Sequence, residues 1–213
     1  MMAKLQLALD TLELNDALKL LEKVNPYIDI AEVGTPFVYR SGLKAVREIR
    51  KNFPELYILC DGKIMDAGAY ESGEQFEAGA NCISVLGVTD DATIMACVEA
   101  AKKYGGEVSV DTICIKDWKR IIEIENMGVD YISVHTGVDQ QAKGRTPLDD
   151  LREISELVTK CKISVAGGIH AETVEEYLQY SPDVVIVGGG ILNQEQPEIA
   201  ARVIKGKINR FKE

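Results

Sequence analysis

The sequence contains no run of about 18 or more apolar residues, the length that a helix needs to cross a bilayer, so we expect no membrane span. The first residues, MMAKLQLALD, lack the basic region, the long apolar stretch and the cleavage site of a signal peptide, which predicts a cytoplasmic protein. Basic residues are too few to balance the acidic ones. The formal net charge of -10 would repel a nucleic acid, although a small phosphorylated metabolite can still bind to backbone N–H groups and a helix N-terminus.

The sequence also lacks CxxC pairs. Its five cysteines are odd in number, which is typical of neither a disulfide framework nor a zinc site, so we expect reduced and mostly buried thiols. They are Cys60, Cys82, Cys97, Cys114 and Cys161. Linkers, low-complexity segments and shifts in composition are absent too, and we therefore predict one domain over residues 1–213.

Eight short apolar runs recur along the chain, rich in β-branched residues. Their nearly continuous hydrophobicity is typical of parallel strands that are buried on both faces. The runs cover residues 5–9, 28–34, 56–60, 82–87, 108–110, 131–135, 163–167 and 184–189. Segments with helical periodicity lie between them, including 117–128, which Asp117 can cap and Gly128 can end, and a second that begins at Thr146-Pro147. Successive runs end about 20 to 30 residues apart, which predicts an α/β fold of the (β/α)₈ TIM barrel type. An open, doubly wound sheet is the alternative.

Five of the eight runs end at or next to an ionisable residue. These residues are Asp10, Glu32, Asp61, Asp111 and His135. The carboxyl ends of barrel strands form the active-site face, so we expect these side chains to converge there. A cluster of buried carboxylates needs cations, which Lys63 or a divalent metal can supply. Mg²⁺ prefers oxygen ligands, and we predict Glu32 and Asp61, on neighbouring strands, as its ligands.

The stretch DGKIMD places Asp61, Lys63 and Asp66 within six positions at the end of an apolar run. In extended backbone Asp61 and Lys63 point to the same side, while Asp66 lies where the chain turns into the next helix. We interpret the three as parts of one charged site. The alternative is a solvated turn in which Asp61 caps the helix.

His135 is one of two histidines, and its position at the end of the sixth run favours a role in proton transfer over a role as a core residue. The other, His170, is expected to face solvent in the first turn of a helix, and we assign it no role. Glycine pairs follow the last two runs. Gly167, Gly168, Gly189 and Gly190 are therefore candidate phosphate-binding residues, with tight turns as the alternative.

The segment 137–147, GVDQQAKGRTP, fits two interpretations. It can form a mobile lid that brings Lys143 and Arg145 near a phosphate, or it can be an ordinary polar loop. The sequence does not favour either of them.

Six motifs, in this order along nearly the whole chain, closely resemble the family of 3-hexulose-6-phosphate synthases, within the orotidine 5'-monophosphate decarboxylase suprafamily. They are LQLALD, EVGTP, DGKIMDAG, VHTG, AGGI and VGGGI. The resemblance implies a (β/α)₈ homodimer with shared active sites, Mg²⁺ and an enediolate intermediate. It implies that D-ribulose 5-phosphate condenses with formaldehyde, that Asp66 reaches the partner's site, and that Asp10, Asp66 and Asp111 orient Lys63 and substrate hydroxyls.

Related families differ at particular positions. Orotidine 5'-monophosphate decarboxylases need no metal and commonly carry an arginine after the eighth strand, where this chain has Gly188 to Gly190. The 3-keto-L-gulonate 6-phosphate decarboxylases typically carry Glu, Arg and Thr where this chain has Asp111, Val138 and Ala166, as in the synthases. Gly62 departs from the synthase pattern, which usually has a bulkier apolar residue there. The decarboxylase is the nearest alternative, and a non-catalytic sugar-phosphate-binding barrel is a second.

Overall fold

The computed structural model describes residues 2–211 and shows a closed barrel of eight parallel strands, in which each strand pairs with its neighbours in chain order and β8 pairs with β1. The strands are β1 (Lys4–Leu9), β2 (Ile30–Val33), β3 (Tyr57–Ile64), β4 (Cys82–Leu86), β5 (Glu107–Asp111), β6 (Tyr131–His135), β7 (Lys162–Ala166) and β8 (Val184–Val187). The predicted TIM barrel is confirmed, and the open sheet is excluded because the barrel closes.

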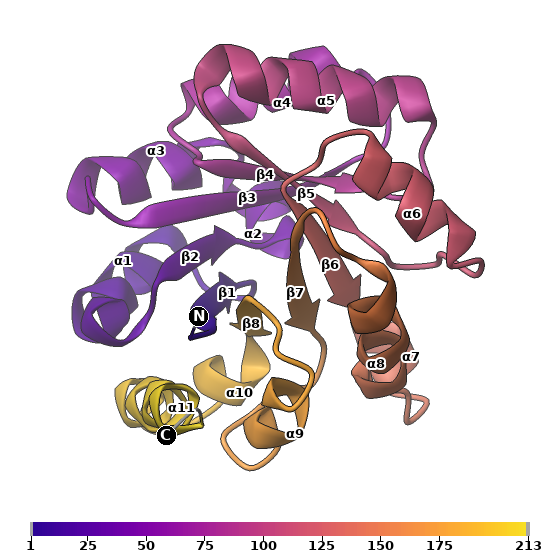
Figure 1. Cartoon of the computed structure of the whole chain (residues 1–213). Helices are drawn as coiled ribbons and strands as arrows, with labels where there is room; N and C mark the ends of the chain where they lie inside the picture. The colour runs from indigo at the N-terminus through magenta and orange to yellow at the C-terminus, as the bar shows by residue number, and fades with distance from the viewer. Residues whose placement is uncertain (1, 212–213) are drawn as a thin grey trace.

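Helices surround the strands (Figure 1). They are α1 (Leu14–Val24), α2 (Thr35–Ser41), α3 (Lys44–Asn52), α4 (Gly68–Glu77), α5 (Asp91–Tyr104), α6 (Lys119–Asn126), α7 (Val138–Gln141), α8 (Leu148–Leu157), α9 (Val174–Leu178), α10 (Gly189–Leu192) and α11 (Pro197–Arg210), with a 3₁₀ turn at Asn25–Tyr27. Within residues 2–211, none of the helices has the length and apolar character that crossing a membrane demands. All five cysteines are free, and Cys60, Cys82 and Cys97 are buried.

The strands divide their side chains between two layers. On β5, Val108 and Val110 are fully buried in the main core, which lies between the barrel and helices such as α6. The alternate residues of that strand, Ser109 and Asp111, face the barrel interior and line a cavity. On β5 the period of two thus separates the residues of the main core from those that line the cavity.

The two helices predicted in detail are present. In α6 the Asp117 carboxylate accepts a hydrogen bond of 3.0 Å from the Lys119 N–H, and Gly128, with φ +84°, follows the end of the helix. Helix α8 begins directly after Pro147. Both helices start slightly later than the sequence pattern indicates.

Strand β3 differs from the prediction, because it continues through Ile64 rather than ending near Asp61. Its pairing with β4 shifts register between Cys60 and Ile64, and Lys63 has φ +46°, in the left-handed region. The prediction that regular extended backbone directs Asp61 and Lys63 to one side is therefore wrong. A β-bulge brings the two side chains together instead, as bulges near active sites often re-aim a side chain. The alternative in which Asp61 caps a helix is wrong as well.

Candidate active site

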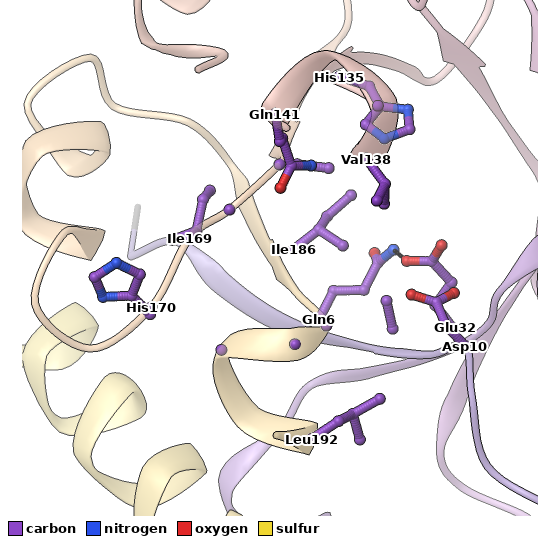
Figure 2. Close-up of a pocket in the computed structure, with 18 of the residues that line it drawn as sticks. Gln6, Asp10, Glu32, His135, Val138, Gln141, Ile169, His170, Ile186 and Leu192 are labelled. Atoms are coloured by element: carbon purple, nitrogen blue, oxygen red, sulfur yellow. Dashed lines mark hydrogen bonds between the residues drawn. The ribbon is translucent and has the colours of Figure 1, made fainter. Parts of the chain in front are cut away.

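A cavity of about 1550 Å³ opens at the carboxyl ends of the strands. The structure places most of the predicted site residues on its wall: Asp10, Glu32, Asp61, Lys63, Asp111, His135, Gly167, Gly168, Gly189 and Gly190. Figure 2 shows Gln6, Asp10 and Glu32 on one side of this cavity and His135, Val138 and Gln141 on another. The cavity is large enough for a phosphorylated sugar.

Lys63 lies at the centre of the charged groups. Its Nζ is 2.8 Å from Asp61 Oδ2 and 2.8 Å from Asp111 Oδ2, so one ammonium joins carboxylates from two strands. Burial alone would lower the pKa of Lys63, but the two carboxylates hold that pKa above its ordinary value. Lys63 therefore keeps its proton and its positive charge within the cavity.

Asp111 orients His135. Burial alone would raise the pKa of Asp111, but the contacts with His135 and Lys63 hold it well below its ordinary value. Its Oδ2 lies 2.9 Å from His135 Nδ1, and an ionised carboxylate can only accept a hydrogen bond. The Nδ1 therefore carries the proton and donates it, which leaves Nε2 as the nitrogen that can exchange a proton with a bound molecule.

Two hydroxyl groups that the sequence analysis missed hold the Asp61 carboxylate. Thr35 Oγ1 donates to Asp61 Oδ2 at 2.8 Å, and Ser84 Oγ donates to Asp61 Oδ1 at 2.6 Å. Ser84 Oγ also accepts a hydrogen bond of 2.9 Å from the Lys63 N–H, so it connects both sides of the β3 bulge. Thr35 lies within the motif EVGTP, but no sequence signal distinguishes Ser84 from an ordinary strand residue.

Glu32 and Asp10 are neighbouring carboxylates whose pKa values are raised although Lys63 lies nearby. Burial, with Asp61 and Asp10 as neighbours, raises the pKa of Glu32 to about 8, and its Oε2 accepts a hydrogen bond of 2.6 Å from Gln6. Burial and Asp61 also raise the pKa of Asp10. A Cβ at Gly34 would collide with Asp10 Oδ1, so glycine at that position leaves room for the Asp10 carboxylate.

The same carboxylates could hold a metal ion. Among residues 2–211, no group of three or more His, Cys, Asp or Glu side chains lies close enough together to form a metal site. Mg²⁺, however, is usually bound by one or two carboxylates together with substrate oxygens and water. Burial, together with Asp61 and Asp10, raises the pKa of Glu32, and a cation bound beside it would favour the ionised carboxylate. The donor set of Glu32 and Asp61 therefore fits Mg²⁺.

The four glycines line the cavity next to β7 and β8. Gly167 and Gly168 have φ of +130° and +68°, which only glycine adopts readily. At Gly190 a Cβ would collide with the carbonyl oxygen of Ile169, so the two loops pack together without side chains between them. This geometry supports both alternatives of the sequence analysis, a tight turn and a close approach to an anion.

The segment after β6 lines the cavity with its first part only. Helix α7 contributes Val138 and Gln141, and the Gln141 amide donates to the Thr136 carbonyl at 2.7 Å. Lys143 and Arg145 do not line the cavity, and Arg145 Nη2 lies 3.6 Å from Asp150 Oδ2. These two basic residues lie away from the cavity here, and the mobile lid and the polar loop both stay predictions for this segment.

Two other site residues lie away from the charged centre. Asp66 is exposed, accepts a hydrogen bond of 2.7 Å from the Ala67 N–H and does not line this chain's cavity. His170 lies on the outer cavity wall (Figure 2), in the loop before α9 rather than in the helix as predicted. Its N–H donates to Thr173 Oγ1 at 3.2 Å, and the helix begins only after that turn.

Comparison with known proteins gives consistent matches over the whole barrel. The model of a family described as Orotidine 5'-phosphate decarboxylase / HUMPS family matches residues 3–204. A 3-hexulose-6-phosphate synthase of Bacillus subtilis (strain 168) is 48% identical over 202 residues, which cover 94% of this chain and 96% of the relative. One of Staphylococcus aureus (strain MSSA476) is 45% identical over 206 residues, which cover 96% and 98%.

Solved structures agree with the sequence matches. The 3-hexulose-6-phosphate synthase of Salmonella typhimurium superposes with a TM-score of 0.96 at 46% identity, over 98% of this chain and 99% of that chain. KGPDC of Streptococcus mutans superposes with a TM-score of 0.92 at 25% identity, over 99% of both chains. These matches confirm the resemblance found in the sequence. They show that the chain is an enzyme of the aldehyde-lyase type. The chain belongs to the orotidine 5'-phosphate decarboxylase / HUMPS family.

Proposed function

We propose that the chain is a 3-hexulose-6-phosphate synthase, which condenses D-ribulose 5-phosphate with formaldehyde to D-arabino-hex-3-ulose 6-phosphate. The central observation is the ion pair of Lys63 with both Asp61 and Asp111, at 2.8 Å each, beside a histidine that Asp111 orients. This arrangement supplies a fixed positive charge and a proton carrier at one place. The names of relatives at 45% and 48% identity support this reaction rather than another enediolate reaction.

The cavity suggests how the sugar phosphate binds. Its phosphate would accept hydrogen bonds from the backbone N–H groups around Gly167, Gly168, Gly189 and Gly190, where the chain approaches closely without side chains. Its ketone and the neighbouring hydroxyl would then lie near Glu32 and Asp61. A Mg²⁺ ion bound by these two carboxylates would supply positive charge to those oxygens.

The protein's own groups account for the proton and charge changes. Removal of a proton from C1 converts the sugar phosphate to a cis-enediolate. Lys63, protonated between Asp61 and Asp111, stabilises the negative charge on the enediolate oxygens, because a preorganised cation in a buried site acts strongly. His135 is our candidate for proton transfer through Nε2, and a water-linked carboxylate is the alternative base. Asp10 and Asp111 orient Lys63 and the substrate hydroxyls.

We further propose a homodimer with shared active sites. Asp66 is exposed and lies outside the cavity of its own chain, which is compatible with a role in the site of a partner. Tyr39 of α2 and Tyr70 of α4, at 88% and 71% exposure, and Met65, which follows β3, at 52%, are large exposed side chains. A partner subunit would cover them. The cytoplasmic location stays a prediction from the sequence.

Formaldehyde-dependent consumption of D-ribulose 5-phosphate tests the proposal, measured with Mg²⁺ and again with excess EDTA. Turnover that EDTA abolishes and added Mg²⁺ restores would support both the synthase activity and the metal site. Turnover that EDTA leaves unchanged would contradict the metal site alone. Sugar-phosphate binding without any turnover would favour a non-catalytic barrel.

A 3-keto-L-gulonate 6-phosphate decarboxylase is the second candidate, because loss of CO₂ can produce the same enediolate. The similarity to KGPDC of Streptococcus mutans, with a TM-score of 0.92, favours this candidate over other reactions. Release of CO₂ from 3-keto-L-gulonate 6-phosphate, without formaldehyde-dependent turnover, would replace our proposal with this activity.

A further inference from the structure

Four consecutive strands each direct a serine into the barrel. Ser84 of β4 is in register with Ser109 of β5, and Ser133 of β6 is in register with Ser164 of β7. Their neighbours along each strand belong to the outer core, so all four hydroxyls face inward. Barrel interiors are usually filled by bulky branched side chains, and serines in their place leave room.

Two of these serines are not candidates for binding a ligand: Ser84 already has hydrogen-bond partners, and Ser164 does not line the cavity. Ser84 holds Asp61 and the Lys63 N–H, as described above. Ser164 is buried beneath the cavity and does not line it. The remaining two, Ser109 and Ser133, line the cavity although they are only 3% and 8% exposed.

The hydroxyls of Ser109 and Ser133 form no hydrogen bond with any other group of residues 2–211, in contrast to Ser84. Both residues line the cavity, so their hydroxyls are available to a molecule bound there. The Ser164 hydroxyl is also without a partner within residues 2–211, but it is buried and does not line the cavity. Ser109 precedes Asp111 by two residues and Ser133 precedes His135 by two, which places them about 7 Å further into the barrel. In the pairing of β5 with β6, Ser133 is in register with Asp111 and Ser109 with Tyr131, so the hydroxyls lie beside and below the Lys63–Asp111–His135 group. We call this neutral, hydroxyl-lined part of the cavity wall the recess.

The recess offers two neutral hydroxyl donors, which suit a small neutral acceptor better than a phosphate. In the proposed binding mode the phosphate lies at β7 and β8 and the sugar oxygens lie at β2 and β3. Because His135 of β6, held by Asp111 of β5, is the candidate for proton transfer at C1, the C1 end of the sugar lies toward these two strands, next to the recess. We propose that Ser109 and Ser133 form the subsite for formaldehyde and donate hydrogen bonds to its carbonyl oxygen. This inference rests on the proposed function.

The chemistry balances without another reactant. After C1 has lost a proton, its electron pair forms the new carbon–carbon bond with the formaldehyde carbon, and the C2 ketone re-forms. The π electrons of formaldehyde move to its oxygen, which becomes an alkoxide and takes up one proton. The proton removed from C1 equals the proton gained. Hydroxyl donors in the recess would stabilise the alkoxide as its charge develops.

The test distinguishes an effect on the use of formaldehyde from an effect on the binding and activation of D-ribulose 5-phosphate. Ser109→Ala and Ser133→Ala each remove one donor, and Ser164→Ala is the matched control from the same wall of the barrel. We expect kcat/KM for formaldehyde to fall about fivefold for each of the first two variants, the effect of one neutral hydrogen bond. The KM for D-ribulose 5-phosphate should not change. Exchange of its C1 hydrogen with D₂O, measured by NMR without formaldehyde, should proceed at the wild-type rate in all three variants.

A fourth variant tests the subsite by blocking it rather than by removing a donor. Ser109→Val fills the recess, and we expect it to abolish condensation while C1 exchange continues. Unchanged formaldehyde kinetics in Ser109→Ala and Ser133→Ala would overturn the subsite, as would equal losses in exchange and condensation. Absence of both exchange and condensation in the wild-type protein would instead overturn the proposed function.

Discussion

The side-chain amide of Gln75 occupies the space that a side chain at Gly62 would need. A Cβ built at Gly62 would collide with Gln75 Nε2 and lie 3.0 Å from Gln75 Oε1. Gln75 is 6% exposed, and within residues 2–211 its Oε1 has no hydrogen-bond partner. Gln75 from α4 thus fills the volume beside the residue that lies between Asp61 and Lys63. A side chain at Gly62 would therefore require the Gln75 amide to move.

We therefore predict that Gly62→Val destabilises the protein by about 2 kcal/mol, because an added side chain forces a packed neighbour to move. Gln75→Ala should restore part of that loss in the double variant. Urea unfolding of the wild-type protein, both single variants and the double variant gives the coupling between the two positions. Strictly additive effects would show that Gln75 and Gly62 do not share this space.

Ser84 connects the two parts of the bulge that presents Asp61 and Lys63. We predict that Ser84→Ala lowers kcat by roughly tenfold to a hundredfold with a smaller effect on KM, because displaced catalytic groups act poorly even when substrate binds. Ser84→Thr retains the hydroxyl and should recover most of the loss. Ser164→Ala, which removes a serine outside the cavity, should behave as wild type.

Steady-state kinetics and thermal unfolding of the same Ser84 preparations check this prediction. If the fall in activity only follows a fall in the folded fraction, or if Ser84→Thr is as impaired as Ser84→Ala, the serine has a structural role and does not position the charged groups.

Much of the site could be predicted from the sequence because each strand end is visible as the end of an apolar run. Asp10, Glu32, Asp111 and His135 follow from that pattern together with the closed barrel. The pattern shows where a residue lies along its strand but not what it contacts across the barrel. Ser84 was missed for this reason, since its role depends on a register shift between Cys60 and Ile64 that no local signal marks.

The glycine-rich loops limited the prediction in a different way. The segment GGIHAET was expected to continue directly into a helix at His170. Gly167 and Gly168 adopt positive φ and extend the loop, so α9 begins at Val174 and His170 remains on the outer cavity wall. The segment 137–147 shows the same limit, because the charges of Lys143 and Arg145 do not reveal that α7 directs Val138 and Gln141 toward the cavity instead.

The raised pKa of Glu32 predicts that stability depends on pH. The folded protein holds this proton up to about pH 8, whereas the ordinary pKa is 4.5. The folded state therefore binds the proton more tightly, and the resulting stability is complete below about pH 4.5 and is lost as the pH rises toward 8. A shift of this size corresponds to a loss on the order of 4 kcal/mol.

Urea unfolding in EDTA between pH 5 and pH 8 measures this loss, with Glu32→Gln as the control that cannot ionise. The free energy of unfolding should fall with rising pH in the wild-type protein and change much less in Glu32→Gln. Saturating Mg²⁺ should offset the loss at pH 8 in the wild type only, because the cation binds the ionised carboxylate. Equal pH dependence in both proteins would assign the effect to other groups.

Mixed dimers test whether Asp66 acts in the site of the partner. Lys63→Ala and Asp66→Ala chains should each be inactive alone. After subunit exchange, half of the dimers contain one chain of each kind, and one of their two sites has both residues, so about a quarter of wild-type activity should return.

A mixture of Lys63→Ala with Asp61→Asn is the matched control, because Asp61 and Lys63 contact each other within one chain at 2.8 Å and no intact site can form. Affinity tags of two kinds confirm that exchange has occurred. Recovery only in the first mixture places Asp66 across the dimer interface, and no recovery despite proven exchange places its action within its own chain.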